Sequence, residues 1–383
     1  MCVQQRRSDL VYLDHAASTP WRAEARAAFD AAIDTGSANA SGSHRAARRA
    51  RALVEDARDE LADVVGVDAG SVVFTSGGTE SDDLAVFGRH AAVGGTVLCT
   101  AVEHPAVLEA VNRLGGKVVG CDRSGVIDLE QLASLLDGDV RLVSVMTVNN
   151  EVGTVQPIIE VAELVRDRAP AAGVHTDAVQ ALTWLDLRAV SPHVDLMSLS
   201  AHKIGGPQGV GALIVSPDVA ISARHVGGGQ ERERRSGTHN VAGIVAMAAA
   251  ARAADRERAV DVARIGGLRD RLVDRIVAEI PDVARTTAHD AAVAGFAHLC
   301  FGGLESEELL FLLDDAGVCA SAASACASGA QQSSHVLAAM GVDPDLARGS
   351  LRLTLGHTTT VADVDAAAAA VIGAAQRLQA VAR

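Results

Sequence analysis

The stretch Val194-Asp195-Leu196-Met197-Ser198-Leu199-Ser200-Ala201-His202-Lys203-Ile204-Gly205-Gly206-Pro207 combines the two features on which the rest of the chain depends. Its first residues suit a buried strand, and Ser200, His202 and Lys203 follow directly, ahead of a Gly-Gly-Pro turn. The chain has 34 lysines and arginines in total, of which only Lys117 and Lys203 are lysines. A desolvated lysine can lose its proton and form a Schiff base, which arginine does not do at working pH. The pattern therefore predicts that Lys203 is a covalent catalyst, and the alternative is a chance survivor of a GC-rich codon bias.

The bulk composition narrows the class of protein. At 383 residues the chain is long enough for two domains or one large one, and 49% hydrophobic content with 36 glycines is typical of a well-packed α/β protein. The net charge of −14 and the aromatic content of 2% argue against a surface for nucleic acid or an anionic membrane. No apolar run approaches the roughly 18 residues of a transmembrane helix, and the N-terminal residues lack the apolar core of a signal peptide. We therefore expect a cytoplasmic protein with no membrane partner and no direct nucleic-acid partner.

Six cysteines are spread along the chain, at positions 2, 99, 121, 300, 319 and 326. No pair has C-x-x-C spacing and no histidine cluster accompanies them, so the sequence predicts free thiols and no metal site. Cys326 differs from the others because it lies in 321–330, a run of small residues that predicts a mobile segment. A thiol on such a segment suits the transfer of a group between two places, and the alternative is a linker with an incidental cysteine.

Short apolar strands alternate with helices over the first two thirds of the chain. Strands are expected near 71–75, 96–100, 117–121, 141–147, 174–176, 195–200 and 211–216, with helices near 105–114, 129–136 and 157–168 among them. This alternation predicts an α/β fold with a mostly parallel sheet covered on both faces. An amphipathic helix is expected from 45 to 65, ending at Gly66, and a long helix from 237 to about 258. A small α+β unit, with a helix near 306–315, follows the long helix. We place the large domain at 16–255 and assign 1–15 and 256–383 to the small α+β domain.

Polar residues follow the predicted strands where the carboxyl ends of a parallel sheet bind ligands. A Gly-Gly-Thr turn at 77–79 can present backbone N–H groups to an anion at a helix N-terminus. Each of these polar residues alone has a structural explanation. Together they provide the amine, the carboxylate and the anion cradle that pyridoxal phosphate requires. Lys203 would supply the amine and Asp177 the carboxylate for the ring nitrogen. The expected phosphate contacts are Gly78, Thr79, Ser200 and His202.

Several short segments together resemble one enzyme family, in family order from residue 12 to 356. They are Tyr12-Leu13-Asp14-His15-Ala16-Ala17, Thr75-Ser76-Gly77-Gly78-Thr79-Glu80-Ser81, Glu103-His104, Val148-Asn149-Asn150-Glu151-Val152-Gly153, His175-Thr176-Asp177-Ala178-Val179-Gln180, Ser200-Ala201-His202-Lys203, Gly227-Gly228-Gly229-Gln230-Glu231-Arg232, Arg235-Ser236-Gly237-Thr238, Ser324-Ala325-Cys326 and Ser350-Leu351-Arg352. The chain resembles the cysteine desulfurases, pyridoxal-phosphate enzymes of the class V aminotransferase superfamily. The resemblance implies an aspartate aminotransferase-like large domain and removal of sulfur from L-cysteine.

The resemblance also implies a role for each matching residue. Lys203 would hold the cofactor and move the Cα proton, while Cys326 would take the sulfur as a persulfide and leave L-alanine. The other implied cofactor contacts are His104, which would stack on the ring and act as an acid or base, Asp177, Gln180 and Asn150, with Thr238 reaching the phosphate from the second subunit of a homodimer. Arg352 would bind the substrate carboxylate, a bidentate role that suits a guanidinium, with assistance from Asn39. A protein sulfur acceptor would complete the cycle.

Two departures and two alternatives accompany this interpretation. Ala323 stands where relatives usually have glycine, which restricts the φ angles open to the cysteine loop. The chain stops at Arg383, whereas longer relatives carry a C-terminal tail that docks an iron–sulfur scaffold protein.

The near alternative activity is a selenocysteine lyase or cysteine lyase on the same fold. The distant alternative is a non-catalytic regulator on the same fold, for which the sequence offers no basic helix-turn-helix segment.

Overall fold

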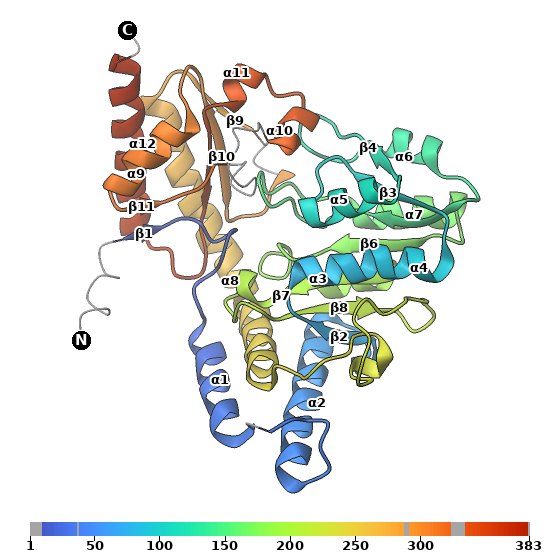
Figure 1. Ribbon diagram of the computed structural model, residues 1–383. Coiled ribbons are helices and arrows are strands. Elements are labelled where there is room, and N and C mark those ends of the chain that lie inside the picture. The colour runs from blue at the N-terminus through green and yellow to red at the C-terminus, as the bar shows by residue number, and fades with distance from the viewer. Residues whose placement is uncertain (1–9, 37, 287–290, 323–333, 382–383) are drawn as a thin grey trace.

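The computed structural model describes residues 10–36, 38–286, 291–322 and 334–381, and these contain a large central sheet and two smaller ones (Figure 1). The central sheet has seven strands in the order β2-β8-β7-β6-β5-β3-β4. Their bounds are β2 Val72–Thr75, β3 Thr96–Thr100, β4 Lys117–Val119, β5 Val140–Ser144, β6 Gly173–Asp177, β7 Leu196–Ser200 and β8 Gly211–Val215. Strand β8 runs opposite to the other strands of this sheet and is antiparallel to both of its neighbours, β2 and β7, so the mostly parallel sheet expected from the sequence is confirmed.

Alternating side chains of the strands face two different hydrophobic clusters. In β2, Val72 and Phe74 belong to one cluster, whereas Val73 belongs to the other. This is the period-two pattern of a strand that is buried on both faces. The first cluster is covered by α2 (Arg45–Val65), α7 (Ile158–Arg168) and the first part of α8, and the second by α5 (Pro105–Arg113) and the helical segment 78–93. That segment comprises α3 (Gly78–Asp83), a π-helical turn (Leu84–Gly88) and α4 (Arg89–Val93).

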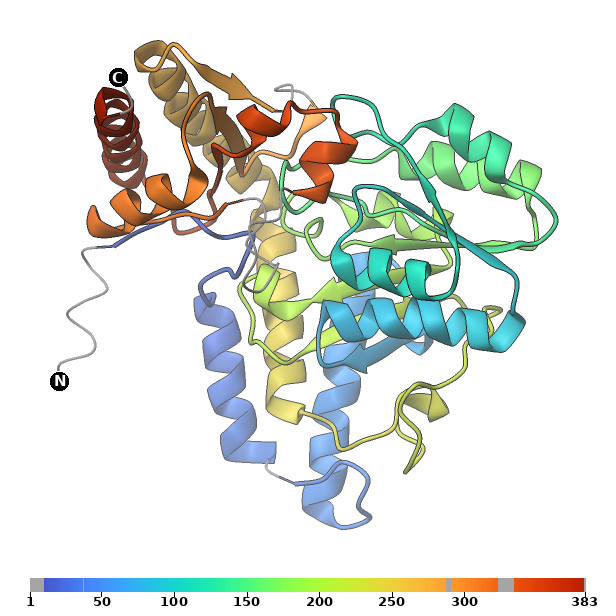
Figure 2. The same cartoon turned by 45° about the horizontal axis from the view of Figure 1, so that its top comes forward.

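Helix α8 (Val241–Glu279) is longer than the sequence predicts and connects two cores. The expectation of a helix ending near residue 258 was wrong, and the proposed domain boundary at 255 falls inside α8. The highly charged segment after 258 remains helical because Ile265, Leu268, Leu272 and Ile276 keep helical spacing and pack in a second core. The first part of α8 packs against the central sheet, with α1 (Ala23–Gly36) and α2 beside it in both views (Figure 1 and Figure 2).

The second core is built on an antiparallel sheet of order β12-β10-β9 and a parallel pair, β1-β11. The strands are β1 Val11–Tyr12, β9 Val283–Arg285, β10 Phe296–Phe301, β11 Val318–Cys319 and β12 Ser350–Thr354. Helices α9 (Ser306–Asp315) and α12 (Val361–Val381) pack on this part. The remaining helices are α6 (Leu129–Leu135), α10 (His335–Ala339) and α11 (Pro344–Ala347), together with short 3-10 turns. Within the described ranges, no helix is both long enough and apolar enough to cross a lipid bilayer.

Candidate active site

Five parallel strands direct their carboxyl ends to one edge of the central sheet. Thr75, Thr100, Asp177 and Ser200 end β2, β3, β6 and β7, and β5 ends shortly before the Asn149-Asn150 turn. The antiparallel strand β8 begins at this same edge, where Gly211 pairs with both Thr75 and Ser200. The helix-starting turn at 77–79, His104, and the turn that carries His202 and Lys203 follow three of these strand ends. We call this edge the rim.

A glycine-rich backbone turn, which we call the glycine cradle, lies at the rim between β2 and α3. A Cβ on Gly211 would lie 2.6 Å from both the Gly77 Cα and the Leu199 carbonyl oxygen, so only glycine permits this close approach of two backbones. The Ser200 side chain is buried, and its Oγ has no hydrogen-bond partner within the described part of the chain. A buried hydroxyl without a partner is costly, which indicates that this cradle takes a polar ligand.

Lys203 lies in a short 3-10 turn after β7 and reaches the N-terminal segment that follows β1. Its Nζ donates hydrogen bonds to the carbonyl oxygens of Ala16 and Ala17, the second at 3.0 Å. The Gln180 side chain donates to the same Ala16 oxygen at 2.9 Å. The backbone of the lysine turn is also fixed, because Thr19 donates from its backbone N to the His202 oxygen at 2.8 Å and from its Oγ1 to the Lys203 oxygen at 3.0 Å.

Asp177 is buried at the end of β6, and the half-buried His104 and Lys203 lie near enough for their charges to act on it. The Asp177 side chain is 5% exposed, and its Oδ1 accepts a hydrogen bond from the Val179 backbone N at 2.9 Å. Burial raises the pKa of Asp177, while the nearby His104 and Lys203 work in the opposite direction. Burial lowers the pKa of His104, whose Nδ1 accepts from the Ala106 backbone N at 3.1 Å as the cap of α5.

A layer of buried polar groups beneath Asp177 was not found from the sequence. His175 is fully buried and shares hydrogen bonds with the Ser144 hydroxyl at 2.8 Å and the Ser198 hydroxyl at 3.0 Å. Burial lowers the pKa of His175 to about 3 and, with help from the Asp177 charge, raises the pKa of Glu103 to about 8. Burial and Asp177 also raise the pKa of Asp82, whose Oδ1 lies 3.7 Å from the His175 Nε2. Asp82 was overlooked because an acid in the first turns of a helix is normally a surface residue.

Arg352, in β12, reaches across from the second core. Its guanidinium is 7% exposed, donates to the Asn150 carbonyl oxygen at 2.8 Å and pairs with the Asp14 carboxylate at 2.9 Å. Asp14 is a further residue that sequence reasoning quoted only as part of a motif.

The turn 149–153 was expected to be polar because it binds a ligand, but much of its polarity is satisfied internally. The Asn149 side chain accepts from two backbone N–H groups of the turn and donates to the Val102 oxygen. The Glu151 carboxylate accepts a 2.5 Å hydrogen bond from the Ser334 hydroxyl. Of this turn, Asn150 alone was named as a site residue, and its backbone oxygen is what contacts Arg352.

Three of the predicted site residues do not join this group in the single chain. Asn39 and Thr238 are exposed, and among the described residues no hydrogen bond links either of them to the rim. Asn39 lies on the α1–α2 connection, at the lower end of the molecule in Figure 1. Cys326 and the neighbouring Ala323 lie outside the described residues.

Comparison with known proteins identifies the family to which this chain belongs. The model of the aminotransferase class-V family matches residues 11–367. The chain belongs to the class-V aminotransferase family, among its cysteine desulfurases. An "IscS-like cysteine desulfurase" of Mycobacterium tuberculosis is 45% identical, over 96% of this chain and 97% of that protein. A solved "NifS-like protein" superposes with a TM-score of 0.89 at 32% identity, covering 95% of this chain and 98% of its own.

A further similar structure has been solved with an amino acid bound. The structure described as SspA in complex with cysteine has a TM-score of 0.78 and 28% identity, and covers 90% of this chain and 98% of its own. The family match and these relatives confirm the resemblance found from the sequence motifs, and with it the α/β fold.

Proposed function

We propose that this class-V enzyme removes sulfur from L-cysteine, giving L-alanine and a persulfide on Cys326, with pyridoxal phosphate bound at the rim. The observation that carries the proposal is the meeting of Lys203, Asp177 and His104 at one sheet edge, with Arg352 of the second core bonded to Asn150 at that edge. A selenocysteine lyase or cysteine lyase would use the same rim, but would not load sulfur on Cys326.

The residues present fit pyridoxal phosphate. The glycine cradle and the unpartnered Ser200 Oγ suit a phosphate group, joined by Gly78, Thr79 and His202. Asp177 would pair with the protonated ring nitrogen, Gln180 and Asn150 would contact the cofactor, and Lys203 would bond to its aldehyde. When bound, the cofactor supplies an electron sink that makes the Cα proton of the amino acid acidic and weakens its Cβ–S bond.

The chain's own residues bind and orient the substrate. Two of the five N–H groups of Arg352 are used by Asn150 and Asp14, which leaves the others for the carboxylate of cysteine. Lys203 takes the Cα proton and later returns one, and His104, whose pKa burial lowers, exchanges protons with the substrate.

The sulfur transfer itself falls to Cys326. Its thiolate attacks the substrate sulfur, so that an S–S bond forms as the Cβ–S bond breaks. The carbon keeps the electron pair and is protonated, so cysteine and a thiol become alanine and a persulfide with no external oxidant or reductant.

The exposed positions of Asn39 and Thr238 support a homodimer in which each chain completes its partner's site. The Gln230 side chain donates to the Ser41 hydroxyl at 3.2 Å, so the loop that carries Asn39 lies beside the segment that leads to Thr238. Both would then face the rim of the second subunit, with Thr238 at the phosphate and Asn39 near the substrate. Light scattering should give twice the chain mass, and a monomer that retains full turnover would contradict this arrangement.

Mass spectrometry after incubation with L-cysteine tests the activity. The expected result is the mass of one added sulfur atom on the peptide that contains Cys326, with release of alanine. Cys326→Ser should abolish the added mass and turnover to alanine. Alanine formation without added sulfur, unchanged in Cys326→Ser, would instead indicate a lyase. A separate test is the visible absorbance of the purified protein with pyridoxal phosphate, which Lys203→Ala should remove.

The proposal also includes the location, the domains and the sulfur acceptor of the protein. We place the protein in the cytoplasm. We divide the chain near residue 255 into a large cofactor-binding domain and a small domain, and the small domain includes residues 1–15. The persulfide would pass to a protein acceptor for iron–sulfur cluster assembly or for thiolation. Capture of proteins on the Cys326 persulfide, released by a thiol reductant, would identify that acceptor, and capture that is equal with Cys326→Ser would contradict it.

A further inference from the structure

A small cavity lies beside Lys203 and is lined in part by the N-terminal segment, at His15, Ala16 and Thr19. Its lining includes Lys203, Gln180, His15 and His357. The space open to the centre of a water molecule is about 20 Å³, which is enough for one water. Several polar groups surround this space, so it meets both conditions, room and polar partners, for an ordered water.

The His15 side chain indicates what this cavity contains. Its side chain is 4% exposed, and neither ring nitrogen has a hydrogen-bond partner among the described residues. The Gly356 backbone packs closely against the His15 ring, because a Cβ built on this glycine would lie only 2.0 Å from the His15 Nδ1. The Tyr12 ring packs edge-on against the His15 ring, with the ring centres 5.3 Å apart. These two contacts restrict rotation of the His15 ring. Two unpartnered nitrogens on a fixed, buried ring are expected to be satisfied by water.

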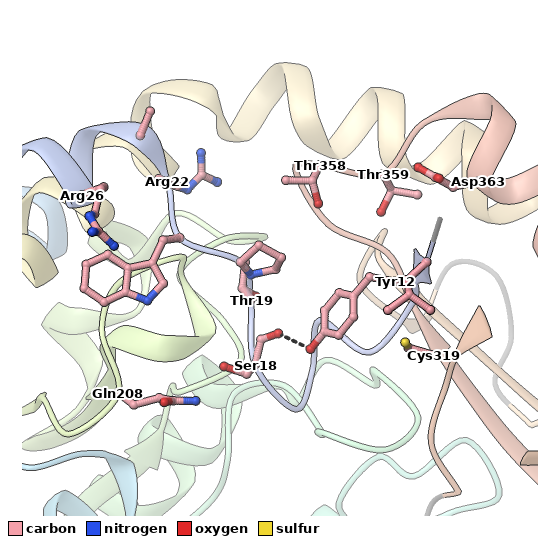
Figure 3. Close-up of a pocket in the computed structure, with 14 residues that line it drawn as sticks. Tyr12, Ser18, Thr19, Arg22, Arg26, Gln208, Cys319, Thr358, Thr359 and Asp363 are labelled. Carbon is pink, nitrogen blue, oxygen red and sulfur yellow. Dashed lines mark hydrogen bonds between the residues drawn. The ribbon is translucent and has the colours of Figure 1, made fainter. Parts of the chain in front are cut away.

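The cavity also leads toward solvent. The half-buried His357 lies with its ring centre 6.3 Å from that of His15, and its Nδ1 likewise has no partner in the described part of the chain. Thr19 lines both this cavity and an open surface pocket of about 860 Å³, where Thr358 and Thr359 also lie (Figure 3). The polar groups therefore run from Lys203, through the cavity and His15, to His357 and the surface.

We propose that an ordered water in this cavity and the His15 ring form a proton path that joins Lys203 to solvent at His357. The inference rests on the proposed role of Lys203 as the group that moves the Cα proton. After Lys203 has taken that proton, it gives one proton to the water, the water gives one to a ring nitrogen of His15, and the other ring nitrogen releases one to His357, which passes one to solvent. The same transfers in reverse bring one solvent proton back to Lys203, which then returns it to the substrate. Each member gains one proton and loses one, so no charge remains on the path.

The electrostatic surroundings suit a relay through neutral rings. Burial, His357 and Arg22 lower the pKa of His15 to about 3, so its ring is neutral and presents one acceptor and one donor. Burial also lowers the pKa of His357, to about 4. The charged groups that act on His357 have both signs and are Arg22, Arg264, Asp261 and Glu257.

The isotope content of the product tests the path. When L-cysteine deuterated at Cα is turned over in ordinary water, a working path replaces the deuterium on Lys203 before it returns. The wild-type enzyme is then expected to give alanine with little deuterium at Cα. His15→Phe, which keeps a ring but removes both nitrogens, is expected to retain at least several-fold more deuterium. His15→Asn keeps a polar group and should restore part of the exchange.

A matched control separates this effect from general damage. Within the described residues, His90 in α4 also has a ring nitrogen without a hydrogen-bond partner, but it does not line the cavity. His90→Phe should therefore leave the isotope content unchanged. Equal deuterium retention in the wild type and both His15 variants would overturn the proposal, whatever their rates.

A second measurement does not depend on turnover. A crystal structure of the protein without added cofactor is expected to show one ordered water within hydrogen-bond distance of a His15 nitrogen, and a dry cavity would overturn the proposal. Failure of the proposed function would be distinct, because Lys203→Ala would then keep the cofactor absorbance or turn over cysteine.

Discussion

At the scale of single residues, Arg352 shows how a substrate-binding group is prepared. A guanidinium at the end of a long side chain loses conformational freedom when it is held by fixed acceptors. Here one acceptor is the Asn150 backbone and the other is the Asp14 carboxylate, which belongs to the segment after β1. Since Asp14 touches Arg352 and not the proposed reacting atoms, it is a positioning residue.

Asp14→Asn should therefore raise the KM for cysteine more than it changes kcat. Loss of a charge-assisted hydrogen bond costs about 1.5–3 kcal/mol, and partial retention by the amide leaves an effect of about tenfold in KM. Steady-state kinetics would measure the split. Asp345→Asn is a matched control, because its ion pair with Arg348 is surface-exposed and contributes little. Equal losses of kcat in the two variants would contradict the positioning role.

At the scale of elements, a buried ion pair helps to hold the segment before α8 in place. Glu231, Arg232 and Glu233 adopt φ angles of 48°, 55° and 64°, which residues other than glycine rarely adopt. The Glu231 carboxylate accepts from Arg58 of α2 at 2.7 and 2.8 Å, from the Phe74 backbone N of β2 at 2.8 Å, and bonds to His239. This network joins the segment that leads to Thr238 to a helix and a strand.

The pH dependence of stability follows from this network. Burial alone would raise the pKa of Glu231, but hydrogen bonds from Arg58 and His239 outweigh it and lower the pKa to about 2. The resulting stabilisation is fully present above the ordinary glutamate pKa and is lost as the pH falls from about 4.5 toward 2. Glu231→Gln should lower the free energy of unfolding by about 3 kcal/mol at neutral pH and flatten this acid dependence.

Denaturant unfolding at several pH values would measure this, with Glu55→Gln as the control. Glu55 pairs with the same Arg58 but is half exposed, so its loss should cost less than about 1 kcal/mol. Identical pH profiles for the wild type and Glu231→Gln would show that the ion pair does not carry the dependence.

The elements also show where sequence reasoning succeeds. Helix α2 was predicted with its observed bounds, because amphipathic spacing ends at Gly66, whose φ of 80° is the left-handed cap that glycine favours. Strand β3 and helix α9 were likewise predicted with their observed bounds. The candidate site could also be predicted from the sequence, because the residues that follow each parallel strand meet at one edge of the sheet.

What the sequence did not reveal depends on contacts between distant segments. Nothing local distinguishes Asp82 from a surface acid, or Asp14 from an ordinary residue after a strand. The continuation of α8 past residue 258 was missed because the many charged residues there were read from the local sequence alone. The burial of Ile265 and Leu272 depends instead on a core formed by residues before and after that helix.

At the scale of the whole molecule, α8 makes the two cores dependent on each other. Its first part packs with the central sheet through residues such as Met247, and its second part packs with β10 and α12 through residues such as Leu272. Trp184 contacts both hydrophobic clusters, and a Cβ on Gly295 would lie 2.3 Å from its ring. One continuous helix and one shared tryptophan favour cooperative unfolding of both cores.

Far-UV circular dichroism and tryptophan fluorescence should therefore report the same urea midpoint. The chain has two tryptophans, so Trp21→Phe isolates the signal of Trp184 at the junction of the cores. Gly267→Ala, at an exposed position in α8 with no atom within 4 Å of the added Cβ, should raise both midpoints together, by about 0.5–1 kcal/mol in unfolding free energy. The contrasting variant is Gly349→Ala, whose Cβ would lie 2.0 Å from the Phe301 oxygen and should lower both midpoints. Two separate transitions, with only one of them shifted by Gly267→Ala, would show that the cores unfold independently and that α8 does not couple them.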